Sequence, residues 1–293
     1  MDLTPSVLRQ FLPALAEISC AAGNEIMRIY QNHLCHDCEV EQKSDGTPVT
    51  EADKRADQMI SEHLARLTPD IPIISEESVF EVPFEKRHAW SRYWLIDPLD
   101  GTKEFIEKTG EFSVNIALID RHHPCLGVVY APASEDLYLA VKGEGAYKLS
   151  AAPRFLDQQQ GRLSEASLFA DLKPISCDRV DQNRPMRVAV SRRHGALSQR
   201  YFSAFDRVHK IKMGSALKTC LVAEGRADVY PRFGPTSLWD TAASQCVLEA
   251  AGGAVLNAAG HALEYVQTES LLNPFFIAVG DPDYPWPTFP EVL

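Results

Sequence analysis

Asp97-Pro98-Leu99-Asp100-Gly101-Thr102 is the most informative part of this chain, and it directly follows the run Tyr93-Trp94-Leu95-Ile96. The aromatic and β-branched run predicts a buried strand, and Pro98 should end its hydrogen-bond ladder because proline has no backbone donor. Asp97 and Asp100 then lie together at the exit of the strand, where two carboxylates can bind one hard divalent cation. Gly101 and Thr102 offer backbone N–H groups to a phosphate oxygen. Alone, the stretch is equally compatible with a turn that carries two solvated aspartates.

Three further acidic segments favour the metal site. The short strand expected at 71–75 ends in Glu76-Glu77, the segment Asp45-Gly46-Thr47-Pro48-Val49-Thr50-Glu51-Ala52-Asp53 lies upstream, and Trp239-Asp240-Thr241 lies far downstream. In this order the four segments resemble the lithium-sensitive, magnesium-dependent phosphatases of the inositol monophosphatase superfamily. The resemblance covers roughly residues 6 to 280. Within the superfamily, residues 97–105 look most like those of bacterial CysQ-type 3'(2'),5'-bisphosphate nucleotidases.

The pattern of elements predicts an α+β or α/β protein. Apolar residues from Leu8 to Ile29 repeat at helical spacing and predict one long helix that tolerates Pro13 near its start, and 50–67 predicts a second helix. Strands are expected at 71–75, 93–97, 111–120, 125–131 and 136–141 as an antiparallel meander. From residue 186 onward, strands and helices alternate as in an α/β layer. The resemblance implies a layered α/β/α/β/α sandwich of the inositol monophosphatase and fructose bisphosphatase type.

The segment 150–185 is rich in Gln, Ser, Asp and Pro and predicts a linker or lid. We therefore expect an N-terminal domain over 1–155 that carries most of the metal ligands. A C-terminal domain over 156–293 should carry Asp240 and the residues that select the substrate.

Composition restricts the class of protein without identifying it. The 293 residues, 45% of them hydrophobic, suffice for a large core, and the formal net charge of −11 argues against a protein that binds nucleic-acid polymers. A small polyanionic substrate remains compatible with that charge. The N-terminus has no signal-peptide pattern, no apolar run approaches a membrane span, and the seven cysteines are an odd number. These features predict a cytoplasmic protein with reduced thiols.

The resemblance implies a set of ligands for two or three Mg²⁺ ions. Glu76, Asp97 and the Leu99 carbonyl would bind the first ion, and Asp97, Asp100 and Asp240 the second. Chain alternation sends only one of the adjacent acids 76 and 77 into the site, and the motif position selects Glu76. N-capping of the helix that follows Trp239 would by itself be a sufficient structural reason for Asp240.

The catalytic residues implied by the resemblance are Asp53, Glu76 and Thr102. Asp53 would polarise Thr102, and together with Glu76 this threonine would align a water molecule and accept its proton. A purely structural interpretation of Asp53 also exists, because Thr50 followed three residues later by an acid is typical of a helix N-cap.

Substrate-binding residues are expected around the same motifs and in the second half of the chain. Besides the ligands Glu76, Asp100 and Asp240, the resemblance implies a set that comprises Gly101, Thr102, Lys103, Ser215, Lys218 and Arg232. The last three would hold a second phosphate and the nucleoside, with Ser191-Arg192-Arg193-His194 as a further wall. Ala216 departs from the related pattern, where a second serine is common. Lys218 and Arg232 could also be ordinary surface residues with no role in binding.

The resemblance thus implies an enzyme that removes the 3'-phosphate of adenosine 3',5'-bisphosphate, a by-product of sulfate assimilation, with the sulfated precursor as a further substrate. An inositol or sugar monophosphatase is the nearest alternative. A non-catalytic protein that binds divalent cations is an alternative of another class. Peripheral contact with the inner membrane and the oligomeric state stay open. Cys35 and Cys38, with His33 nearby, lack a second close ligand pair, so a zinc or redox site there is not favoured.

Overall fold

The computed structural model describes residues 3–32, 40–42, 48–158, 163–192 and 195–291. The described helices are α1 (Pro5–Arg9), α2 (Leu12–Asn32), α3 (Glu51–Leu67), α4 (Phe84–Arg87), α5 (Thr102–Ile106), α6 (Ala152–Gln158), α7 (Glu165–Asp171), α8 (Ala196–Phe202), α9 (Leu217–Ala223) and α10 (Ala242–Ala250). Two 3₁₀ turns are η1 (Val79–Glu81) and η2 (Leu238–Asp240). None of the helices in these ranges is long and apolar enough to cross a membrane.

The described strands form three sheets. A pair consists of β1 (Val40–Gln42) and β2 (Pro48–Thr50). The large sheet has the order β3 (Ile73–Ser75), β4 (Arg92–Asp100), β5 (Ser113–Asp120), β6 (His123–Ala131), β7 (Asp136–Val141), β8 (Gly145–Leu149) and β9 (Lys173–Ile175). The third sheet has the order β11 (Val208–Lys212), β10 (Met186–Val190), β12 (Val229–Arg232), β14 (Phe276–Val279) and β13 (Ala254–Asn257).

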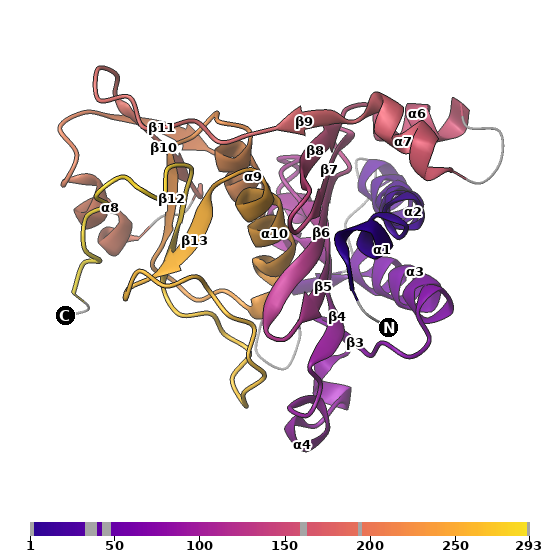
Figure 1. Ribbon diagram of the computed structural model, residues 1–293. Helices are drawn as coiled ribbons and strands as arrows, with labels where there is room; N and C mark the ends of the chain where they lie inside the picture. Colours follow the sequence, from indigo (N-terminus) through magenta and orange to yellow (C-terminus); the bar gives the residue numbers. More distant parts are fainter. Residues whose placement is uncertain (1–2, 33–39, 43–47, 159–162, 193–194, 292–293) are drawn as a thin grey trace.

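The large sheet is buried on both faces. Helices α2 and α3 cover one face of the large sheet, and α9 and α10 lie between its other face and the third sheet (Figure 1). Helix α8 packs against the third sheet. Trp94 and Ile96 of β4 belong to the core beneath α2 and α3, whereas Tyr93 and Leu95 belong to the core around α10. A strand covered on both faces must be apolar at successive positions, which explains this run. The layers are α/β/α/β/α, as expected.

The antiparallel meander is confirmed from β4 to β9, which pair in chain order. Its expected first strand, at 71–75, is not part of it, because β3 pairs parallel with β4. The prediction that Pro98 ends β4 is wrong. The strand continues to Asp100, which pairs with Ser113, after an irregularity between residues 97 and 100. Pro98 falls within this irregularity, where no ladder donor is needed. The consequence is that both aspartates stay on one continuous strand.

The first helix also differs from its prediction. The chain forms α1 and then α2, with a break at residues 10–11. Pro13 lies in the first turn of α2, where its missing N–H needs no partner, so the helix starts just before it instead of running through it.

The segment 150–185 is not an unstructured linker. It contains α6, α7 and β9, and β9 pairs with β8 as the last strand of the large sheet. The proposed boundary at 155 lies inside α6, and the division into two domains stays a prediction. In the second half, β10, α8, β11, α9, β12 and α10 follow the expected alternation, while β13 and β14 were not predicted.

Candidate metal and phosphate site

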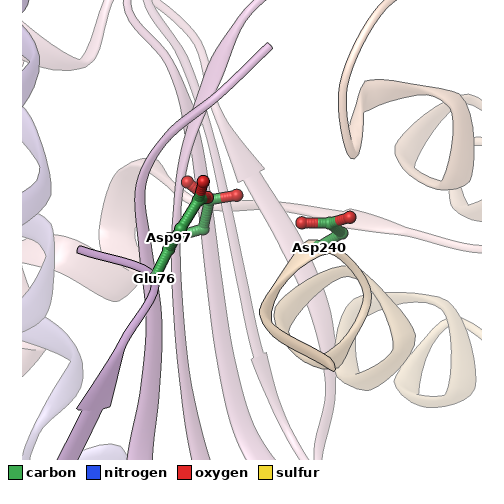
Figure 2. Close-up of side chains that lie close together, drawn as sticks. All are labelled: Glu76, Asp97 and Asp240. Carbon is green, nitrogen blue, oxygen red and sulfur yellow. The ribbon is translucent and has the colours of Figure 1, made fainter. Parts of the chain in front are cut away.

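Three carboxylates from distant parts of the chain meet at the edge of the large sheet. Glu76 follows β3, Asp97 lies on β4 and Asp240 ends η2. One oxygen from each lies within 4.8 Å of the other two. Figure 2 shows Glu76 and Asp97 side by side on the strand side, with Asp240 approaching from the turn before α10. The expected choice of Glu76 over Glu77 agrees with this geometry.

The charges in this cluster fit a bound cation. Burial, and then repulsion from Glu76 and Asp100, raise the pKa of Asp97 well above its usual value. Burial, and then repulsion from Asp100 and Glu76, do the same to the pKa of Asp240. Asp97 is only 1% exposed. Several buried carboxylates are costly unless a positive charge compensates them, and hard oxygen ligands of this kind suit Mg²⁺.

Asp100 lies beside the three-carboxylate cluster and has partners of its own. Its Oδ2 accepts hydrogen bonds from Ala216 N at 2.6 Å and from Asn115 Nδ2 at 3.4 Å. Burial raises its pKa to about 6, although the Lys218 charge opposes the shift. The Leu99 carbonyl oxygen lies 3.4 Å from the Thr102 hydroxyl, whose single proton has a shorter acceptor in Asp53 at 3.1 Å. Metal binding by Asp100 and Leu99 stays a prediction.

Asp53 makes both contacts that the sequence suggested, one with Thr50 at the start of α3 and one with Thr102 beside the carboxylates. Its Oδ2 accepts from the Thr50 backbone N–H at 2.8 Å and from the Thr50 hydroxyl at 2.6 Å, which completes the capping box of α3. Its Oδ1 accepts from the Thr102 hydroxyl at 3.1 Å. Burial raises the pKa of Asp53. One carboxylate therefore fixes the start of α3 and orients Thr102 of α5.

The start of α5 requires a glycine. Gly101 has φ +95°, and a Cβ there would lie 3.2 Å from the Glu111 carbonyl oxygen. Its left-handed backbone turns the chain from β4 directly into α5 beside the carboxylates. Gly214 also approaches Glu111 closely, because a Cβ at that position would lie 2.4 Å from the same oxygen.

A cavity of about 270 Å³ opens next to Asp240 and Asp100. Four further residues expected to bind substrate line it, namely Lys103, Ser215, Lys218 and Arg232. Glu76, Gly101 and Thr102, also expected to bind substrate, are not among its lining residues. Lys218 is buried, and its Nζ donates to the Ser215 carbonyl at 2.5 Å. Burial lowers the pKa of Lys218 to about 8, against the opposing effect of Asp100.

Arg232 has an incomplete set of partners. Its Nη2 donates to the Pro235 carbonyl at 2.7 Å, whereas its Nε is buried and has no hydrogen-bond partner within the described ranges. Ser191 also lines the cavity, and Arg192 pairs instead with Glu111 at 2.6 Å. Arg193 and His194 lie outside the described residues, as do Asp45, Cys35, Cys38 and His33.

Sequence reasoning missed residues that complete the site. Asn115 contacts Asp100 from the neighbouring strand, Tyr230 lines the cavity, and Asn273 contacts the turn of Asp240. Asn115 and Tyr230 lie within apolar strand runs, where they read as ordinary strand residues. Asn273 lies between an apolar pair and Pro274, and no local motif marks it as a site residue.

Known proteins resemble this chain in sequence and in fold. The model of the inositol monophosphatase family matches residues 8–281. The 3'(2'),5'-bisphosphate nucleotidase CysQ of Escherichia coli K12 is 43% identical over 266 residues, which is 90% of this chain and 98% of that protein. The protein of the same name from Haemophilus influenzae is 36% identical and covers 92% of each chain.

A solved structure supports the same assignment. CysQ from Bacteroides thetaiotaomicron, described as a bacterial member of the inositol monophosphatase family, superposes with a TM-score of 0.77 at 34% identity, over 92% of this chain and 97% of that one. An IMPase from Thermotoga maritima, with a TM-score of 0.70 at 24% identity, shares the fold over 92% of this chain and 91% of its own. The matched length, the identity and the fold agree that this chain belongs to the inositol monophosphatase family.

Proposed function

We propose that this protein is a magnesium-dependent 3'(2'),5'-bisphosphate nucleotidase that converts adenosine 3',5'-bisphosphate to AMP and phosphate. The sulfated precursor, 3'-phosphoadenylyl sulfate, would be a second substrate. The names of the relatives that are about 40% identical over most of the chain support this activity. A role in clearing a by-product of sulfur assimilation follows from it.

The observation that carries the proposal is the hydrogen bond from Thr102 Oγ1 to Asp53 Oδ1 at 3.1 Å beside the carboxylate cluster. A protein that only bound a divalent cation would use the same carboxylates but would not need an oriented hydroxyl next to them. Burial also raises the pKa of Asp53. The capping box of α3 needs the Asp53 carboxylate only as a hydrogen-bond acceptor. A hydrolase uses such a pair to direct a water proton.

The residues present fit the metal that this chemistry needs. Glu76, Asp97 and the Leu99 carbonyl would hold one Mg²⁺, and Asp97, Asp100 and Asp240 a second; a third ion remains compatible. Bound Mg²⁺ supplies Lewis-acid stabilisation of the phosphoryl and leaving oxygens and acidifies a water molecule.

The protein groups divide the remaining work. Asp53 fixes the Thr102 hydroxyl, which orients the attacking water, and Glu76 accepts its proton. The backbone N–H groups at residues 101 and 102, at the start of α5, would donate to a phosphate oxygen. The bond between phosphorus and the 3'-oxygen breaks as the bond to the water oxygen forms, and the leaving 3'-oxygen takes up one proton, which balances the proton that Glu76 accepted from the water. Asp240 lies next to the cavity that would hold the rest of the nucleotide.

Selectivity for a bisphosphate rests on the two cations in the cavity. Lys218 is buried there, and Arg232 offers a buried Nε without a protein partner among the described residues. Charge-assisted hydrogen bonds from both groups suit a second phosphate. An inositol monophosphate has no second phosphate to occupy them, so the geometry favours the nucleotide.

Phosphate release from a panel of substrates tests the proposal. The panel comprises adenosine 3',5'-bisphosphate, inositol 1-phosphate and fructose 1,6-bisphosphate, each with Mg²⁺. We expect the highest kcat/KM on the first. Thr102→Val should lower kcat by on the order of a hundredfold or more. Thr109→Val is the matched control, because among the described residues the Thr109 hydroxyl has its hydrogen bonds within its own loop, to Glu104 O and from Glu111 N. Preference for inositol 1-phosphate, or full activity of Thr102→Val, would contradict the assignment.

The cytoplasmic location, the peripheral contact with the inner membrane and the oligomeric state stay predictions or open questions. Fractionation of cells tests the first two, and sedimentation of the purified protein measures the third.

A further inference from the structure

Asp240 reaches the carboxylate cluster from a short turn, unlike Asp97, which a central strand holds in place. Its carboxylate Oδ2 accepts from the Ser237 backbone N–H at 2.9 Å, and its own backbone N–H donates to the Ser237 carbonyl at 3.2 Å. Both contacts depend on the orientation of the peptide groups at Ser237. A group that holds Ser237 in place therefore also holds the direction of the Asp240 carboxylate.

Asn273 provides this fixation. The side chain is 9% exposed, and its Nδ2 donates to the Ser237 carbonyl at 2.6 Å and to Thr241 Oγ1 at 3.1 Å. Its backbone N–H donates to the Thr236 carbonyl at 2.8 Å. One amide thus binds both sides of η2, immediately before and immediately after the three residues that end in Asp240.

A second contact ties the same turn to the large sheet. The Tyr265 phenol lies 3.0 Å from Thr241 Oγ1 and 2.9 Å from Gln245 Oε1, and donates to one of them. The carbonyl of Tyr265 accepts from the Tyr93 hydroxyl at 2.6 Å. Tyr93 lies on β4, the strand that carries Asp97. Tyr93 and Tyr265 are both fully buried, so water cannot replace these bonds without local opening.

We propose that Asn273 is a positioning residue for Asp240, which sets the affinity of the site for divalent cations. The inference rests on the metal site of the proposed function. The amide holds the Ser237 carbonyl and thereby directs the Asp240 carboxylate toward Glu76 and Asp97 before any cation binds. Tyr265 supports the same turn through its contact with Thr241. Groups that orient metal ligands in this way typically change affinity by about 10- to 100-fold when they are removed.

The test compares Asn273→Leu, which keeps the side-chain size but removes the amide, with Thr68→Val. Thr68 is a matched control, because it is 8% exposed and its Oγ1 accepts from Trp94 Nε1 at 2.8 Å. It lies at the opposite end of α3 from Asp53. Binding of Mn²⁺ to the metal-free protein is measured by calorimetry, together with the melting temperature of each variant.

We expect Asn273→Leu to raise the Mn²⁺ Kd by about 10- to 100-fold and Thr68→Val to leave it unchanged. In the phosphatase assay, the Mg²⁺ concentration for half-maximal rate should rise in parallel, while KM for the nucleotide at saturating Mg²⁺ stays constant. Tyr265→Phe, which removes one oxygen only, should raise the Mn²⁺ Kd by about tenfold. It is the decisive variant if Asn273→Leu fails to fold.

Two results would overturn the inference: unchanged Mn²⁺ binding in Asn273→Leu and Tyr265→Phe, or an equal loss in Thr68→Val, which would trace the effect to stability. Failure of the proposed function gives a different result. In that case the unmodified protein itself would bind no Mn²⁺ or release no phosphate.

Discussion

Removing the charge of Lys218 should change which substrate the enzyme prefers. Lys218 lies on α9 in the cavity beside Asp240, is 5% exposed and has a pKa lowered by burial to about 8. At pH 7 the amine is therefore still mostly protonated and can bind an anion. Lys218→Met keeps the length of the side chain and its packing in the buried helix, so the change removes little besides the charge.

The size of the effect follows from the kind of contact. A charge-assisted hydrogen bond contributes about 1.5 to 3 kcal/mol, which corresponds to a factor of about 10 to 150 in kcat/KM. The loss applies only to a substrate that carries the second phosphate. For Lys218→Met, and equally for Arg232→Met, we expect this decrease with adenosine 3',5'-bisphosphate and a change of less than about threefold with adenosine 3'-monophosphate.

Initial rates of phosphate release for both substrates, at saturating Mg²⁺ and pH 7, measure this selectivity. Lys148→Met is the matched control. Lys148 is also partly buried and pairs with Asp136 at 3.0 Å and Glu224 at 3.2 Å, but it does not line the cavity. Equal losses on both substrates in the cavity variants would refute the reasoning, because the cations would then serve the reacting phosphate or the fold.

Three further outcomes test the site and the fold. Asp97→Asn and Asp100→Asn should each abolish hydrolysis while the circular dichroism spectrum stays native; near-normal turnover at saturating Mg²⁺ would mean that the ligands are misassigned. Lithium, similar to Mg²⁺ in size but with half its charge, should inhibit turnover at millimolar concentrations in a titration against sodium and potassium at matched ionic strength, and insensitivity would contradict this expectation. Asp228→Asn should lower the free energy of unfolding at pH 7 by about 3 kcal/mol, because Asp228 is 1% exposed and binds Arg184 at 2.7 Å. Burial acts to raise the pKa of Asp228, but the hydrogen bonds from Arg184 and Arg187 lower it overall. The stabilisation is therefore present above the unfolded pKa of about 4 and is lost as the pH falls below that value. Urea unfolding of both proteins should therefore give converging stabilities in acid, and a constant difference down to pH 2 would be inconsistent with this explanation.

The local elements were predictable wherever one short-range cause dominates. The capping box at Thr50 and Asp53 marks the start of α3 within one residue, and the run before Asp97 marks a doubly buried strand. Predictions failed at prolines, because the free-energy cost of a proline depends on whether its position in the strand or helix needs a backbone N–H donor. Pro98 is tolerated in β4 because the strand pairing is irregular at that point, and Pro13 divides the first helix only because α2 can begin beside it.

The chemistry of the site was readable from residue types and their spacing along the chain. The sequence supplied the acidic motifs, the glycine that turns β4 into α5, and the cations Lys218 and Arg232, since residue type and spacing decide which ligands and backbone conformations are available. The tertiary structure alone decided their geometry. Glu76 lies more than 160 positions from Asp240, and their oxygens meet because α10 packs against the large sheet. The contacts of Asn273 with the Asp240 turn likewise arise from long-range packing, which no local pattern specifies.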